Sequence, residues 1–190
     1  MSKSRIGLML MVIIPLLFCS CLTTEYKEYR FKINRDGSGE GSVKFVNIMS
    51  EKEEGEESVV FSDFGELIDN YLNGQTFEEE NPNYQVTGKK LFEENGVLVG
   101  EVKFNFSSLE SIGFYQAENC DCAPLMYYMD GFSETFKETN GNYLGGDTVF
   151  PFIIWDNDIT EVYIKTIVTE DISNGLSLLA TYKTWEEQQK

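Results

Sequence analysis

The four cysteines of the 190-residue chain stand in two closely spaced pairs, Cys19 with Cys21 and Cys120 with Cys122. Cysteines two residues apart in a turn can bring their Cα atoms within the ~4.4 to 6.8 Å that a disulfide allows, and an oxidising compartment favours the bond. We therefore predict a local disulfide between Cys120 and Cys122. Free thiols, a redox switch or half of a metal site shared with another chain are the alternatives for this pair.

The chain contains no histidine, and this excludes several kinds of catalytic site. A Ser-His-Asp triad, a Cys-His dyad and a histidine-containing zinc site all need an imidazole. Catalysis would have to use carboxylates, tyrosine, lysine or cysteine. A glycosidase needs two facing carboxylates, and 32 acidic residues offer many pairs without distinguishing one. We therefore assign no catalytic residue and expect no cofactor.

Two acidic stretches partly match the calcium-binding loop of EF-hands. In the segment 34–40 oxygen-bearing side chains alternate, but Phe45 occupies the twelfth position, where a bidentate glutamate is needed. In the segment 156–160 the following sixth position is Glu161 rather than glycine. Both departures favour ordinary turns, and we predict no metal site.

Aromatic side chains gather in the C-terminal half of the chain, near the carboxylates of Asp130, Asp156 and Asp158. They are Tyr115, Tyr127, Tyr128, Tyr143, Phe150, Phe152 and Trp155. Sugar- and peptide-binding surfaces combine flat rings with carboxylates, but antiparallel sheets also favour aromatic residues in their cores. We favour the core interpretation, with a protein or glycan partner as the alternative.

The N-terminus has the pattern of an export signal. Lys3 and Arg5 precede a 13-residue apolar stretch from Ile6 to Phe18, which is too short for a bilayer that needs about 20 apolar residues. An ordinary cleavage site needs small residues such as alanine, but the first alanine of the chain is Ala117. A different processing route is therefore expected.

The stretch Leu17-Phe-Cys-Ser-Cys21 resembles the lipobox of bacterial lipoproteins, in which a cysteine after a small residue becomes the lipid-modified N-terminus. A serine precedes Cys21, whereas the bulky Phe18 precedes Cys19 and stands where the family usually has leucine. The resemblance implies a signal peptide over residues 1–20, a diacylglyceryl group on Cys21 and attachment to a membrane through this lipid.

The same resemblance implies a location in the cell envelope, outside the cytoplasm. Two or three acyl chains hold a protein stably on a bilayer, whereas a single chain binds only marginally. Residues 21–25 would then form the lipidated N-terminus and a short tether. In the sorting rules of some lipoproteins, aspartate after the cysteine retains the protein at the inner membrane. Leu22 stands at that position and favours the outer membrane.

The charge of the chain excludes one class of partner. Without residues 1–20 the chain has 13 basic side chains, since Lys3 and Arg5 are lost, and 32 acidic ones, a formal charge of −19. Such a surface repels polyphosphate, so we expect no nucleic-acid partner. The hydrophobic content of 42% exceeds that of a disordered acidic chain and indicates one globular domain over residues 26–190.

Alternation of apolar and polar residues predicts a series of strands. They cover residues 26–34, 42–48, 84–92, 97–106, 125–129, 132–139, 148–155 and 161–169. Turn residues at 35–40 and Asn-Gly within 94–96 join the first four strands into two hairpins, and the charged segment 51–57 is expected to be a loop.

A helix is predicted between the two hairpins. It is capped by Asp63, ended by Gly74 and carries one apolar stripe. The stripe consists of Phe64, Leu67, Ile68, Tyr71 and Leu72. A short helical turn at 107–110 and a helix over 173–187 complete the elements.

These elements predict an α+β fold with a mostly antiparallel sheet, built from β-hairpins with one or two packed helices. With the lipobox resemblance, they predict a lipid-anchored cell-envelope protein that is non-catalytic and binds or braces something outside the cytoplasm. The alternatives are a subunit of a surface or envelope assembly and a small carboxylate-based hydrolase.

Overall fold

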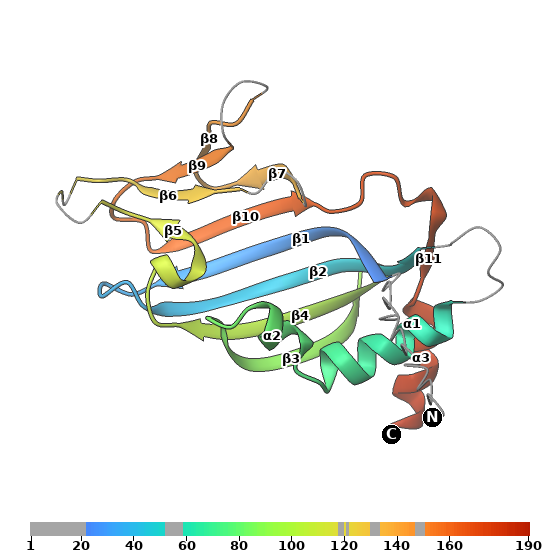
Figure 1. Cartoon of the computed structure of the whole chain (residues 1–190). Coiled ribbons are helices and arrows are strands. Elements are labelled where there is room, and N and C mark those ends of the chain that lie inside the picture. Colours follow the sequence, from blue (N-terminus) through green and yellow to red (C-terminus); the bar gives the residue numbers. More distant parts are fainter. Residues whose placement is uncertain (1–21, 52–58, 118–119, 121, 130–133, 147–150) are drawn as a thin grey trace, which may run out of the picture.

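The computed structural model describes residues 22–51, 59–117, 120, 122–129, 134–146 and 151–190. Its main sheet is antiparallel, in the order β3-β4-β2-β1-β10-β7, with β11 beside the end of β2 (Figure 1). The strands are β1 (Leu22–Ile33), β2 (Gly39–Glu51), β3 (Gln85–Glu94), β4 (Val97–Phe106), β7 (Thr135–Thr139), β10 (Glu161–Ile167) and β11 (Gly175–Ser177). The predicted α+β fold with a mostly antiparallel sheet is confirmed.

A second, smaller antiparallel sheet lies beside the β1 and β10 side of the main sheet (Figure 1). Its order is β5-β6-β9-β8, and its strands are β5 (Phe114–Tyr115), β6 (Leu125–Tyr128), β9 (Phe152–Trp155) and β8 (Asn142–Tyr143). The strands predicted over 132–139 and 148–155 correspond to β7 and β9. Residues 132–133 and 148–150 of those predictions lie outside the described residues.

The helices are short and lie mainly at the opposite end of the main sheet (Figure 1). They are α1 (Val60–Glu66), the π-helix η1 (Leu67–Leu72), α2 (Thr76–Glu80), the 3-10 turns η2 (Glu110–Ile112) and η3 (Ile172–Asn174), and α3 (Leu179–Gln188). η1 follows α1 without a break, so the two form the single amphipathic helix that the sequence predicts.

Apolar packing joins the two sheets. Phe31, Phe104 and Ile164 of the main sheet belong to one buried cluster with Phe114 and Trp155 of the second sheet. The rings of Phe31 and Phe114 meet edge to face, with 5.1 Å between their centroids. The core between the sheets therefore covers the apolar face of the central strands. The alternate residues of those strands lie on the opposite, polar face.

A second cluster joins the helices to the sheet. Leu98 of β4 is fully buried against Phe64 and Leu67 of the first helix and against Leu178 and Tyr182 near the C-terminus. The Tyr182 hydroxyl also donates to the carbonyl of residue 91 in β3 at 3.0 Å. Packing of an apolar stripe on a sheet therefore fixes both helical segments.

The two predicted hairpins form, and their turns use the expected residues. Asn95 and Gly96 have φ values of 54° and 81°, the left-handed pair that a two-residue turn requires. In the other turn Gly37 has a φ of 79°, and the Asp36 carboxylate accepts the Ser38 backbone N–H at 3.1 Å and its hydroxyl at 2.6 Å. Asp36 therefore serves the turn itself, within the segment that partly matches a calcium loop.

The predicted tether at residues 21–25 is wrong for its described part, because β1 begins at Leu22. Leu22 lies opposite Ser50, and the Thr24 hydroxyl donates to the carbonyl of Val46 at 2.6 Å. Threonine favours strands, and a partner strand that is distant in sequence completes the ladder. Cys21, the signal peptide 1–20 and most of the loop predicted at 51–57 lie outside the described residues.

Two predicted helix boundaries are also wrong. α1 begins at Val60, and the Asp63 side chain is not a cap but is buried and accepts a hydrogen bond from Ser50 of β2. The helix predicted over 173–187 begins only at Leu179, because residues 175–177 form β11 against the end of β2. In both cases a contact with β2 overrides the local pattern.

Candidate functional site

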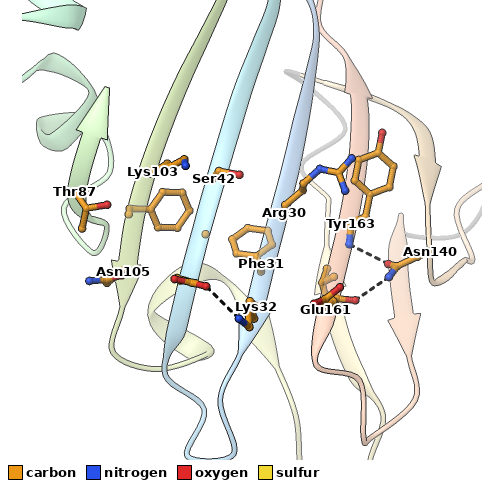
Figure 2. A pocket seen from close by; sticks show the side chains of 14 residues that line it. Arg30, Phe31, Lys32, Ser42, Thr87, Lys103, Asn105, Asn140, Glu161 and Tyr163 are labelled. Carbon is orange, nitrogen blue, oxygen red and sulfur yellow. Dashed lines mark hydrogen bonds and ion pairs between the residues drawn. The ribbon is translucent and has the colours of Figure 1, made fainter. Parts of the chain in front are cut away.

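A cleft of about 450 Å³ lies on the polar face of the main sheet (Figure 2). Strands β1, β2, β3, β4 and β10 all contribute residues to it, so the cleft crosses the sheet near the β1–β2 hairpin. Because successive side chains of a strand point to opposite faces, only alternate residues of each strand project their side chains from this face.

One row of side chains crosses the cleft from strand to strand. Arg30 lies opposite both Tyr163 of β10 and Ser42 of β2, and Ser42 lies opposite Lys103 of β4. Residues paired across antiparallel strands project from the same face. We call Tyr163, Arg30, Ser42 and Lys103 the cationic row, because it contains two cations and no carboxylate.

The next row along the same face has a different composition. Its members, in order across the sheet, are Lys165, Glu28, Lys44 and Glu101. Lys165 and Glu28 approach to 3.5 Å, and Lys44 pairs with Glu94 at 3.0 Å. Charges of alternating sign largely neutralise one another in that row, whereas the charges of the cationic row add together.

The Arg30 side chain is held in place by an aromatic ring. Its Cζ lies 4.5 Å from the centroid of the Tyr163 ring, within the range of a cation–π contact. The distance from Arg30 Nη2 to Glu28 Oε2 is 4.0 Å, the outer limit of an ion pair. Burial, followed by the negative charges of Glu28 and Glu138, raises the pKa of Tyr163 to about 12. The Tyr163 hydroxyl is therefore protonated at neutral pH.

Lys103 is the second cation of the row. Its side chain is exposed, and it forms no ion pair or hydrogen bond with any part of the chain that the structure describes. Figure 2 shows it between Ser42 and Thr87, two neutral side chains that also line the cleft. Its ammonium group can therefore bind an external anion without first losing an internal partner.

Among the residues that line the cleft, the carboxylates lie in the row nearer the hairpin. Glu161, Lys32, Glu40 and Asn105 lie opposite one another there. Lys32 and Glu40 are 3.5 Å apart and both well exposed, which makes their ion pair weak. Carboxylate and amide groups at this edge can exchange hydrogen bonds with hydroxyl groups of a ligand.

Asn140 closes the β10 side of the cleft. Its Oδ1 accepts the backbone N–H of Tyr163 at 2.9 Å, and its Nδ2 donates to the carbonyl of residue 161 at 2.8 Å (Figure 2). The same Oδ1 also accepts the indole N–H of Trp155 at 2.8 Å. Three hydrogen bonds use its polar atoms, so Asn140 positions the wall of the cleft.

The predicted thiol site lies elsewhere. Cys120 and Cys122 are joined by a disulfide with a Cα–Cα distance of 5.1 Å, and both residues are exposed in the connection between β5 and β6. Neither lines the cleft. Cys21, the predicted lipidation site, lies outside the described residues.

The predicted aromatic cluster divides between the core and the surface. Trp155 is buried, and Tyr127 and Tyr143 pack against the core between the sheets. The core interpretation fails for three residues, because Tyr115, Tyr128 and Phe152 are 55%, 46% and 36% exposed. They lie on the outer face of the second sheet, because the residues that alternate with them along the strands face the core.

The structure describes two of the three carboxylates that the sequence places near these rings. Asp156 and Asp158 are exposed in the turn that follows β9. Asp130 and Phe150 lie outside the described residues.

A carboxylate network that the sequence reasoning missed surrounds Glu134. Its Oε1 accepts from Lys27 Nζ at 2.7 Å and from the Tyr29 hydroxyl at 2.8 Å, and its Oε2 accepts from the Thr166 hydroxyl at 2.6 Å. Burial opposes ionisation of Glu134, but the Lys27 ammonium and the hydrogen bonds lower the pKa of this carboxyl below its ordinary value. The one available signal was Lys27, a cation at a core-facing position of β1.

The Glu134 network adjoins a cavity of only about 90 Å³. All its polar groups bond to one another, and burial, followed by the charge of Glu134, raises the pKa of Tyr29 far above its usual range. The network therefore joins β1 and β10 to the residue before β7, and it offers no reactive group.

Among the residues that the structure describes, no group of histidine, cysteine and acidic side chains is placed to hold a metal ion. No helix within those residues is both long and apolar enough to cross a bilayer.

No family model, curated protein or solved structure matches the chain. Its function must therefore be argued from the site itself.

Proposed function

We propose that this protein is a lipid-anchored, non-catalytic component of the cell envelope that binds an acidic glycan in the cleft on the polar face of its main sheet. The observation that supports an acidic ligand is the cationic row. Arg30 and Lys103 both belong to this row, which contains no carboxylate, whereas the whole chain has a formal net charge of −17. An anion is attracted to this row and repelled by most of the remaining surface.

The mixed chemistry of the cleft favours a glycan over an acidic peptide. Separate carboxylates of a chain of uronic acids can pair with Arg30 and with Lys103 through charge-assisted hydrogen bonds. The hydroxyl groups of the sugars can donate to Glu40 and Glu161 and accept from Asn105. An acidic peptide could also pair with the cations, but it has few hydroxyl groups to offer Glu40, Glu161 and Asn105.

The proposed anchor rests on the residues that resemble a lipobox, above all Cys21 after a serine. Because β1 begins at Leu22, a lipid on Cys21 would be attached directly to an interior strand of the main sheet. Leu22 in place of aspartate supports the outer membrane as the location. The acidic surface argues against a nucleic-acid partner.

Calorimetric titration of the detergent-purified full chain with trigalacturonate tests the ligand. We expect measurable binding that weakens as salt is raised, and no binding of neutral maltotriose. Lys103→Glu should weaken binding at least tenfold. Lys137→Glu is the matched control, because Lys137 is an exposed lysine of β7 outside the cleft. Equal affinity of the Lys103 variant and the unaltered protein would contradict the assignment.

Metabolic labelling with a radioactive fatty acid tests the anchor. Cys21→Ser should abolish incorporation of the label, whereas Cys19→Ser should leave it intact. Loss of label from the Cys19 variant alone would show that Cys19 carries the lipid, and it would contradict the assignment to Cys21.

The exposed aromatic residues of the second sheet favour a second candidate, a subunit of an envelope assembly. Tyr115, Met126, Tyr128, Phe152 and Ile154 project from one face of that sheet, and such apolar faces often bind other proteins. Tyr128→Glu should then dissociate a complex that is visible by sedimentation in detergent extracts, and Lys137→Glu should not.

None of the four carboxyl groups with a shifted pKa suits the role of general acid in the hydrolase alternative. The pKa values of Asp36, Glu78, Glu134 and Asp171 are all lowered, whereas the general acid of a glycosidase needs a raised pKa.

A further inference from the structure

A second cavity, of about 290 Å³, lies between the first helix and the main sheet. Leu67 and Leu72 of η1 and Phe77 of α2 line one side, and Phe45 and Leu91 line the other. Its volume is just below the ~300 to 1,000 Å³ that is usual for small-molecule sites, and its lining side chains are mostly apolar.

Gly100 helps to keep this space open. A Cβ atom at this position would lie 3.1 Å from Ile48 Cδ1 and 3.4 Å from Leu91 Cδ2. A larger residue would therefore crowd the wall of the cavity. The missing side chain leaves room beside Phe45, which lies opposite Gly100 in the neighbouring strand.

Four of the five charged residues that line the cavity have partners, and the fifth, Glu80, is exposed to solvent. Lys89 donates to Glu78 at 2.8 Å and to the carbonyl of Gly74 at 2.6 Å, and Lys27 pairs with Glu134 at 2.7 Å. A ligand with a buried charge would have to displace these pairs at a cost in desolvation. The cavity is therefore suited to an uncharged, aliphatic group.

The position of Leu22 identifies the source of such a group. Leu22 lines the cavity, and it directly follows Cys21 in the chain. Adjacent Cα atoms are ~3.8 Å apart, so an acyl group on Cys21 starts next to the cavity wall. Covalent attachment also gives that group a high effective concentration, which a free lipid lacks.

We propose that one acyl chain of the lipid on Cys21 enters this cavity and packs between η1 and the main sheet. The inference rests on the lipidation of Cys21 proposed above. A methylene group gains a similar free energy in an apolar cavity and in a bilayer, so one chain can leave the membrane while the remaining chains keep the protein anchored.

Cross-linking through the lipid itself tests this placement. Cells that produce the full chain are fed a fatty acid with a diazirine near its end, and the purified protein is irradiated, digested and analysed by mass spectrometry. We expect label on the N-terminal peptide and intramolecular cross-links to residues 67–72 and 89–91. Leu72→Trp, which fills the cavity, should reduce these cross-links at least fivefold. Leu144→Trp, at a 51% exposed position, should not.

Leu67→Phe provides a second filling variant in case Leu72→Trp fails to fold. Label on Cys21 with cross-links only to detergent or to other segments would overturn the inference and leave the anchor intact. Unchanged cross-links in the Cys21→Ser variant would show that a membrane lipid fills the cavity. That result would also overturn the inference. Absence of label from the N-terminal peptide would overturn the lipidation itself.

Discussion

The indole nitrogen of Trp155 donates to Oδ1 of Asn140 at 2.8 Å, and the same oxygen accepts the backbone N–H of Tyr163 at 2.9 Å. Trp155 belongs to the second sheet, whereas Tyr163 belongs to the strand that forms one wall of the cleft. One amide oxygen therefore couples the core between the sheets to the position of the cationic row.

Asn140→Ala should destabilise the protein by about 1 to 3 kcal/mol, because the indole N–H of the buried Trp155 loses its partner. Urea unfolding followed by tryptophan fluorescence measures the change. Asn142→Ala, at an exposed position of β8, is the control and should cost less than about 0.5 kcal/mol. Equal stability of the two variants would contradict the coupling.

Gly141→Ala should also destabilise the protein, by about 1 to 3 kcal/mol, because its Cβ would lie within 2.5 Å of the Trp155 ring. Gly146→Ala adds the same methyl group where, apart from its chain neighbours, no atom of the described residues lies within 4 Å, and it should be nearly neutral. Thermal unfolding of both variants measures the difference, and a neutral Gly141 variant would show that the indole ring can move aside.

Glu134→Gln should remove an acid-sensitive part of the stability. The pKa of Glu134 is lowered from 4.5 in the folded protein, so its ionised form stabilises the fold above that value, and this contribution is lost as pH falls through the folded-state pKa. The variant should lose about 1 to 3 kcal/mol at pH 7 and show a flatter decline in acid. Urea unfolding between pH 3 and about 7 tests both effects. Glu138→Gln, at an exposed position of β7, should keep the original profile.

Reduction of the Cys120–Cys122 disulfide should lower stability by no more than about 1.6 kcal/mol, because the bridge closes a loop of only three residues. This corresponds to a melting-temperature change of about 3 to 6 °C. The double variant Cys120→Ser/Cys122→Ser should not respond to the reductant. A larger loss would mean that the bridge holds a packed loop in place.

Local patterns were sufficient for the elements that depend on nearby residues. The Asn95-Gly96 turn, the alternation of β1 and the apolar stripe from Phe64 to Leu72 all predict what forms. The wrong element boundaries all involve contacts with β2, whose partners are distant in the sequence. The Asp63 carboxylate accepts a hydrogen bond from Ser50 of β2 and does not cap the helix. The end of β2 pairs with residues 175–177, which the sequence assigns to a helix.

The cleft could not be found from the sequence, because its chemistry depends on strand register. Arg30, Ser42, Lys103 and Tyr163 are ordinary exposed or half-buried positions of four separate strands, and only the pairing of those strands places them in one row. The same limit applied to Glu134, whose partner Lys27 lies more than a hundred residues away in the chain. Composition could indicate only that cations are scarce.

The start of β1 at Leu22 also sets how the protein would bear mechanical load. β1 is an interior strand, hydrogen-bonded to β2 on one side and to β10 on the other. The hydrogen bonds of an antiparallel pair run perpendicular to the strands, so a force along β1 shears many of them together. With a lipid on Cys21, drag on the anchored protein would pull along this direction. The sheet would resist such extraction far better than it would resist the peeling of an edge strand, whose bonds break one after another.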